Sequence, residues 1–247
     1  MPIYYGGKKI KSLYFGGKKI ASAWYGGKCV YKSSPFLSQP VQLWQLQAPG
    51  PVKSVAVDNQ FNVYAGGGNG YVTKMDNTGK LLWQWNIKYY VESVAVDSNS
   101  NAYVGDTRAY LTVLDSGGNQ TWNWNSNSNG YVAGVAVDSQ FNMYAGDAYY
   151  DGGNANFGHV TKLNSAGHRM WQWQAPSSVY SVAVDSQFNV YAGDASKYVT
   201  KLDSNGNKIW QWMASNTISS VAVDSQFNVY AGDASKYVTK LDSNGNK

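Results

Sequence analysis

The sequence predicts an all-β protein: a five-bladed β-propeller with four-stranded blades, preceded by an N-terminal arm of β-hairpins. The string Ser-Val-Ala-Val-Asp, or its variant Gly-Val-Ala-Val-Asp, recurs at intervals of about 40 residues, which is the length of a propeller blade. Short alternating segments follow each copy, as four strands per blade require. Gly-Gly pairs recur regularly near the N-terminus and indicate the hairpins. The five copies end at Asp58, Asp97, Asp138, Asp185 and Asp224.

The N-terminal arm is defined by Gly-Gly at 6–7, 16–17 and 26–27, each preceded by an aromatic residue and followed by lysine. Two glycines between alternating residues are typical of a tight hairpin turn. We therefore expect a small β-hairpin meander over residues 1–34, too small to be very stable unless it docks on something. Ser33-Ser34-Pro35 reads as the linker, and residues 35–247 as the propeller.

Each blade is predicted from one repeat unit, best seen at residues 181–212. Ser-Val-Ala-Val (181–184) is the inner strand, and Asp-Ser-Gln-Phe-Asn is the turn after it. Val-Tyr-Ala-Gly (190–193) and Tyr-Val-Thr-Lys-Leu (198–202) are the second and third strands. Ile-Trp-Gln-Trp (209–212) is the fourth, with both tryptophans on one face of the strand.

Closure of the ring is predicted from a segment that precedes the first inner strand. Leu43-Trp44-Gln45-Leu46 has the pattern of a fourth strand, whereas the last repeat reaches only a third strand at Leu241. We therefore expect residues 43–46 to complete the last blade. Five inner and five outer strands then balance, which favours five blades.

This unit resembles the propeller repeats of the NHL, SBBP and PQQ-like group, over residues 43–247. The resemblance implies the architecture and little about activity, because propellers host many functions. Residues 181–208 and 220–247 are identical, which indicates either a recent duplication or deliberate construction of a consensus propeller.

Charge is unevenly distributed along the chain. The formal net charge is +5, yet residues 1–32 contain lysines and no acid, and the first acidic residue is Asp58. A basic arm could meet an acidic protein surface, or its lysines could merely solvate the hairpin ends. The arm has no arginine to grip phosphates or read bases, so we do not expect nucleic acid as a partner.

Composition excludes several classes of protein. Only 14% of the 247 residues are charged, and no apolar stretch approaches the length of about 18 residues that a membrane span needs. The first residues lack an apolar signal region, so we expect no signal peptide. Cys29 is the sole cysteine and there are 2 histidines, so we expect neither an internal disulfide nor a zinc site.

The arm repeat Tyr-x-Gly-Gly-Lys-Lys-Ile resembles N-terminal segments of bacteriophage tail, neck and head-fibre proteins, over residues 3–32. The resemblance implies that the arm attaches a displayed domain to the particle. Its partners would be other virion proteins of the capsid, neck or tail. The expected anchor residues are Ile3, Tyr5, Lys8, Lys9, Ile10, Phe15, Lys18, Lys19, Ile20 and Tyr25.

No catalytic constellation is indicated. The sequence has no Ser/His/Asp or Cys/His set and no phosphate-binding loop, so we expect no enzyme, no catalytic residue and no cofactor. The repeated aspartates could form a ring of cation ligands, but capping of the turns explains them better. We therefore assign no metal site.

Two sets of residues are candidates for ligand binding. An insertion between Asp147 and Val160 is rich in Tyr, Asn and Gly, which suits adaptable recognition, although it could equally be a tolerated surface insertion. Tryptophans of the fourth strands could stack on sugars, but packing between blades is the favoured alternative. The candidates are Tyr149, Tyr150, Asp151, Asn154, Phe157, Trp210 and Trp212.

The sequence thus favours a non-enzymatic phage virion structural protein, assembled in the host cytoplasm, with the arm docked on the particle and the propeller displayed for recognition or decoration. The alternative is a soluble multivalent propeller lectin that binds cell-surface glycans, since near-identical blades suit a repetitive ligand.

Overall fold

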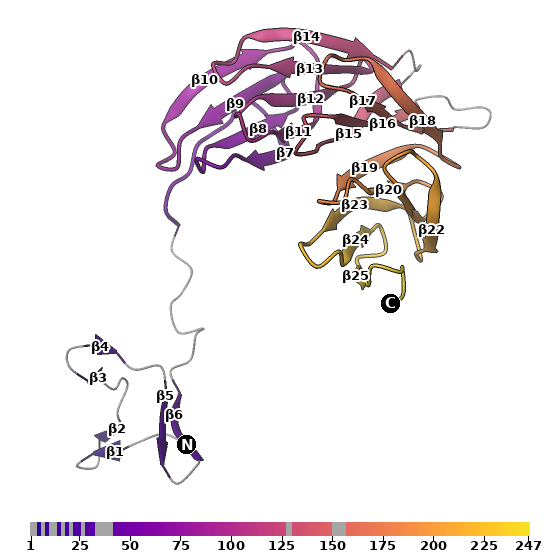
Figure 1. Ribbon diagram of the computed structural model, residues 1–247. Helices are drawn as coiled ribbons and strands as arrows, with labels where there is room; N and C mark the ends of the chain where they lie inside the picture. The colour runs from indigo at the N-terminus through magenta and orange to yellow at the C-terminus, as the bar shows by residue number, and fades with distance from the viewer. Residues whose placement is uncertain are drawn as a thin grey trace. The chain divides into compact units, whose positions relative to one another are not determined.

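A computed structural model describes residues 42–247, except 127–129 and 150–156, and six strands within residues 4–32. The chain divides into two units, Met1–Gln45 and Leu46–Lys247, each described here by itself. All regular structure in the described residues is β (Figure 1). They include no helix that is long and apolar enough to cross a membrane.

The first unit contains three separate two-stranded antiparallel sheets, one around each Gly-Gly pair. Tyr5 pairs with Lys8, Phe15 with Lys18 and Tyr25 with Lys28, as the expected hairpins require. The described strands pair as three separate hairpins and not as one continuous meander. The strands are short, so each hairpin has few backbone hydrogen bonds of its own. They are β1 (Tyr4–Tyr5), β2 (Lys8–Lys9), β3 (Tyr14–Phe15), β4 (Lys18–Lys19), β5 (Ser22–Tyr25) and β6 (Lys28–Lys32).

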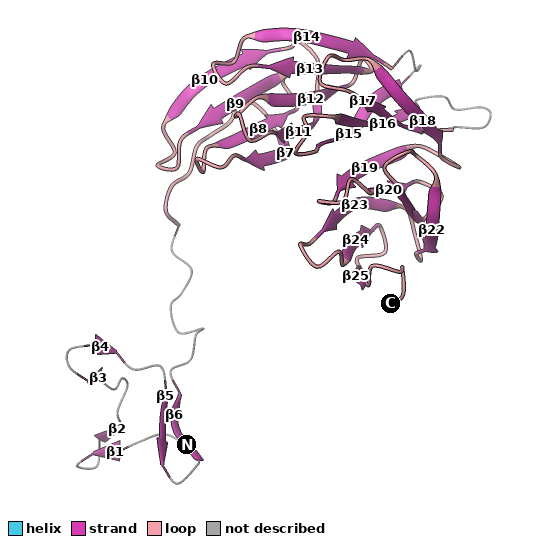
Figure 2. Ribbon diagram, in the orientation of Figure 1, coloured by secondary structure: helices cyan, strands magenta, loops and turns pink. Residues whose placement is uncertain are grey.

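The second unit contains five antiparallel sheets, in which strands next to one another in the chain are neighbours in the sheet (Figure 2). Each sheet corresponds to one repeat of the sequence. The first is β7 (Val52–Val57), β8 (Val63–Gly67), β9 (Tyr71–Met75) and β10 (Leu81–Asn86). The second is β11 (Val91–Val96), β12 (Ala102–Asp106), β13 (Tyr110–Leu114) and β14 (Gln120–Asn125).

The remaining sheets repeat this order. The third is β15 (Gly130–Val137), β16 (Met143–Tyr149), β17 (His159–Leu163) and β18 (Arg169–Gln174). The fourth is β19 (Val179–Val184), β20 (Val190–Asp194), β21 (Tyr198–Leu202) and β22 (Lys208–Met213). The fifth has three strands, β23 (Ile218–Val223), β24 (Val229–Asp233) and β25 (Val238–Leu241).

Successive sheets pack face to face in a propeller-like arrangement. First strands contact one another in the order β7, β11, β15, β19 and β23. The core therefore lies between the sheets, and it is divided into one cluster per junction. At the third junction, for example, Val179 and Val182 of β19 pack with Tyr144 of β16.

Glycine in the second strand allows this close packing. A Cβ atom on Gly193 of β20 would lie 2.4 Å from Cγ2 of Ile218 in the next sheet. Gly66 of β8 has the same relation to Val91 of β11, also at 2.4 Å. Real Cβ contacts are never so short, so a larger residue would push the two sheets apart.

Among the described residues, each of the two end sheets packs on a neighbouring sheet on one side only. Val55 of β7 is 64% exposed, whereas its counterpart Val182 in β19 is 7% exposed. Val238 of β25 is 79% exposed, whereas its counterpart Val199 is 0% exposed beneath β22. The closing strand expected at residues 43–46 is not observed. Residues 42–48 form no strand, and the last sheet has three strands. Regular strand structure requires a paired backbone.

Candidate functional site

A carboxylate follows the first strand of every sheet and holds the turn that comes after it. In the first sheet, Oδ1 of Asp58 accepts hydrogen bonds from the backbone N–H groups of Gln60 and Asn62, both at 2.9 Å. Oδ2 accepts one from the Asn62 side chain at 2.9 Å and one from the Tyr64 hydroxyl at 3.0 Å. This arrangement stabilises the left-handed backbone of Phe61, whose φ is 62°.

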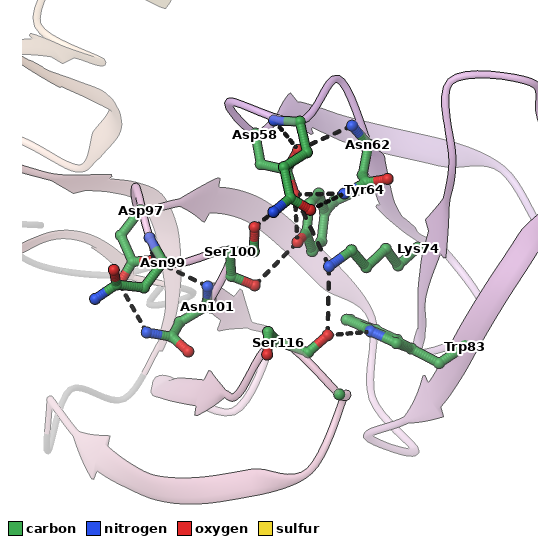
Figure 3. Close-up of polar contacts among 12 residues, drawn as sticks. Asp58, Asn62, Tyr64, Lys74, Trp83, Asp97, Asn99, Ser100, Asn101 and Ser116 are labelled. Carbon is green, nitrogen blue, oxygen red and sulfur yellow. Dashed lines mark hydrogen bonds and ion pairs between the residues drawn. The ribbon is translucent and has the colours of Figure 1, made fainter.

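The same carboxylate connects the first sheet to the second (Figure 3). Ser100, in the corresponding turn of the second sheet, donates its hydroxyl to Asp58 at 2.8 Å. Nζ of Lys74 lies 3.8 Å from Asp58 and donates to the backbone carbonyl of Ser116 in the second sheet at 3.3 Å. Asp58, Ser100 and Lys74 are buried, so the polar cluster fixes how the two sheets meet.

Hydrogen bonds to the Asp58 carboxyl lower its pKa by more than burial raises it. Burial alone would raise the pKa of this carboxyl, but hydrogen bonds from Asn62, Ser100 and Tyr64 stabilise the carboxylate and bring the pKa to about 2. Burial and the same carboxylate raise the pKa of the Tyr64 hydroxyl far above its ordinary value. The cluster is therefore a charged acceptor surrounded by donors at neutral pH.

A tryptophan of the fourth strand forms a second bond across the junction. The indole N–H of Trp83 donates to the Ser116 carbonyl at 3.0 Å, and its ring covers Gly118. Trp171 makes the equivalent bond to Ser204 at 2.9 Å, and Trp210 to Ser243 at 3.0 Å. Lys162 and Lys201 donate to the same two serine carbonyls.

The candidate ligand residue Trp210 therefore sits at a contact between sheets. Its ring packs against Gly245 and its N–H is already used, which supports packing between blades as its role. Trp212 is half-buried and packs on the neighbouring core cluster. Neither residue lies in the insertion after Asp147.

Only part of the insertion is described. Tyr149 ends β16, and its backbone N–H bonds to the Ser178 hydroxyl at 3.2 Å. Phe157 is exposed and lines a shallow cavity of about 390 Å³ with Trp173 and Pro176. The other candidates, Tyr150, Asp151 and Asn154, lie outside the described residues.

The anchor residues are described only as backbone. Tyr5, Lys8, Lys9, Phe15, Lys18, Lys19 and Tyr25 lie in the paired strands β1 to β6. Ile3, Ile10 and Ile20 lie outside the described residues.

A second set of buried aspartates ends the second strands. Asp194 accepts the backbone N–H of Tyr198 on Oδ1 at 3.0 Å, but its buried Oδ2 has no hydrogen-bond partner. Burial raises the pKa of this carboxyl to about 6. Burial also raises the pKa of Asp106 at the same position in β12. In the described parts of the chain, no group of three metal-ligating side chains accompanies these residues.

A cavity interrupts the regular junctions between the second and third sheets. It has a volume of about 310 Å³. Lysine stands at the third-strand position in four repeats, whereas the second repeat has Val113. Sequence reasoning missed this cavity, although alignment of the repeats would have shown the exchange of lysine for valine. Its principal lining residues are Asp97, Tyr103, Val113, Trp122, Phe141 and Ser165.

Comparisons of the chain with family models and with curated proteins find no match.

Replacing Trp210 by Phe is expected to lower the free energy of unfolding more than replacing Trp122 by Phe. Of these two tryptophans, only Trp210 donates to a serine carbonyl across its junction in the described chain. The difference should be about 1 kcal/mol, the typical net value of one hydrogen bond. Chemical denaturation of both variants measures it. Equal losses would show that the Ser243 bond contributes nothing.

Asp194→Asn is expected to stabilise the protein at pH 7 and to change its pH dependence. The native carboxyl has a pKa of about 6 against an ordinary value of 3.8, so the native state binds more protons than the unfolded state between these values. Stability contributed by Asp194 is therefore present below pH 3.8 and is lost as pH rises through 6. The loss amounts to at most about 3 kcal/mol.

Denaturation of the wild type and Asp194→Asn at pH 4 and pH 7 checks this. The asparagine variant should gain relative to the wild type as pH rises. A difference between the two proteins that is the same at both pH values would contradict the assignment.

Proposed function

We propose that the five sheets close into a five-bladed propeller, with residues 43–46 adding the fourth strand to β25. The exposed ends support closure because they are complementary. Val52 and Val55 on the first sheet are exposed. They occupy the same repeat positions as Ile218 and Val221, which are buried between the fourth and fifth sheets. Gly232 on the last sheet has no atom near the position of a Cβ, whereas its counterpart Gly193 is tightly covered.

Closure makes Gly232→Ala destabilising. In a closed ring Gly232 would face Val52 and Val55 as Gly193 faces Ile218 and Val221, so a methyl group would separate the sheets. We expect Gly193→Ala and Gly232→Ala to lower the free energy of unfolding to a similar degree, by about 1–3 kcal/mol. Thermal and chemical denaturation of the two variants measure this.

Gly193→Ala serves as the matched control, because the surrounding sequence of the two glycines is identical. A Gly232→Ala variant as stable as the wild type, beside a destabilised Gly193→Ala variant, would show that the last sheet stays open.

We propose further that the protein is a non-enzymatic bacteriophage virion component. The observation that carries this proposal is the separate N-terminal unit, whose three pairs of short strands are each rich in lysine and aromatic residues. Hairpins with strands of two to five residues bury little surface by themselves, so a partner surface is the natural source of their stability. The lysines favour a partner surface that carries acidic groups.

In this function the arm docks on a capsid, neck or tail protein, and the propeller is displayed for decoration or recognition. The polar clusters of the propeller support a structural role, because Asp58 and its counterparts are occupied in holding turns, and Asp58 also bonds to the next sheet.

Deletion of residues 1–34 is expected to abolish incorporation into phage particles while the propeller remains folded. Mass spectrometry of purified particles and of soluble lysate measures incorporation, and the circular dichroism of the deleted protein checks the fold. The control is the full-length protein measured in the same way, which should be present in particles at a fixed stoichiometry.

Continued incorporation of the deleted protein would overturn the anchor role. Full-length protein found only in the soluble fraction would favour the carbohydrate-binding alternative. The exposed ring of Phe157 beside Trp173, in the shallow cavity described above, would then be the first surface to test with glycans.

A further inference from the structure

A lysine found in four of the five sheets is absent from the second sheet, β11–β14, which packs on the third sheet, β15–β18. Lys74, Lys162, Lys201 and Lys240 each hold an ammonium group near the face of a tyrosine on their own sheet, with distances to the ring centroid from 4.9 to 5.4 Å. Tyr103 of β12 is the corresponding tyrosine in the second sheet. Val113 occupies the lysine position there, so within the described residues no lysine on this sheet supplies the cation.

Lys74 defines the surroundings of the ammonium at a complete junction. Nζ lies 4.9 Å from the centroid of the Tyr64 ring, 3.8 Å from Asp58 and 3.3 Å from the carbonyl oxygen of Ser116. Figure 3 shows the lysine reaching these groups between the two sheets. An aromatic face, a carboxylate and a carbonyl are together a strong site for a cation with N–H donors.

The equivalents of all three groups line the cavity at the second junction. Tyr103 corresponds to Tyr64, Asp97 to Asp58 and Ser165 to Ser116. Asp97 accepts bonds from the Tyr103 hydroxyl at 2.8 Å and the Asn101 side chain at 2.9 Å, as Asp58 does from its own neighbours. Among the described residues, no basic side chain forms an ion pair with Asp97.

The other walls of the cavity suit an alkyl chain. Val113 replaces the lysine stem, and the rings of Trp122 and Phe141 come from the two sheets on either side. Trp122 differs from Trp83, Trp171 and Trp210, because no bond from its indole N–H to a serine carbonyl is found in the described chain. The volume of about 310 Å³ is at the lower end for ligand pockets, which suits a small molecule or one side chain.

We propose that this cavity binds a primary alkylammonium group, with its nitrogen between Asp97 and the face of Tyr103 and its carbon chain against Val113 and Trp122. The ligand takes the place that lysine occupies at the other junctions. This site depends neither on closure of the ring nor on attachment of the arm.

The first test is titration of the full-length protein with n-butylammonium chloride, followed by isothermal calorimetry. We expect saturable binding to one site. Val113→Lys should weaken it at least tenfold, because the introduced ammonium occupies the cavity. Val113→Ala is the matched control and should retain binding, and n-butanol, which lacks the charge, should not bind.

The second test creates the same cavity elsewhere. Lys74→Val removes the ammonium between the first two sheets and should raise the stoichiometry for n-butylammonium from one to two. Circular dichroism must show that each variant is folded. Asp97→Asn supplies an independent variant, which should weaken binding at least tenfold if Val113→Lys fails to fold.

A lysine-containing tripeptide with blocked ends distinguishes the two sources of such a group. Binding of both the peptide and n-butylammonium would assign the site to a lysine side chain of another protein, and binding of n-butylammonium alone would assign it to a free small amine. Either result supports the proposal. Absence of saturable binding, or binding that Val113→Lys and Asp97→Asn both leave unchanged, would overturn it.

Discussion

The carboxylate after each first strand, buried in the first four sheets, is the interaction on which the rest of the second unit depends. Asp58 satisfies the backbone of its own turn, the tyrosine of the next strand and the serine of the neighbouring sheet. Removal of the carboxylate would leave several buried donors without an acceptor, which is costlier than the loss of any one bond. In the first sheet one group therefore determines both the inner turn and the contact with the next sheet. Asp97, Asp138 and Asp185 hold their own turns and tyrosines in the same way.

Much of the architecture could be predicted from the sequence because it is local and repeated. The strands expected at 190–193 and 198–202 are observed as Val190–Asp194 and Tyr198–Leu202, and in the arm Tyr5 pairs with Lys8, Phe15 with Lys18 and Tyr25 with Lys28. The end of the array could not be predicted in this way. Whether residues 43–46 pair with β25 depends on contacts between the two ends of the chain, and such contacts leave no periodic signal. The candidate site could not be predicted for another reason. Val113 is an ordinary strand residue in the sequence, and only the contact of Lys74 with the next sheet shows what a lysine does at that position.

Identical sequence does not give identical surroundings. Val199 and Val238 stand in the same repeat context, yet one is fully covered and the other is exposed. The same holds for Gly193 and Gly232. Each repeat supplies two faces and completes only its own hairpins, while burial comes from the neighbours on either side, as in repeat proteins generally.

Interchangeable junctions have a consequence for the evolution of the chain. Because the contacts of Trp171 and Trp210 with the following sheet are equivalent, recombination that inserts or deletes one whole repeat here preserves the local contacts of each junction that remains. The number of repeats in this half of the molecule can thus change during evolution while each remaining junction keeps its local contacts. The junction at Val113 lacks this freedom, since its partner surface is unlike the others. The junction between the second and third sheets is therefore the one position in the described array that a neighbouring repeat cannot replace.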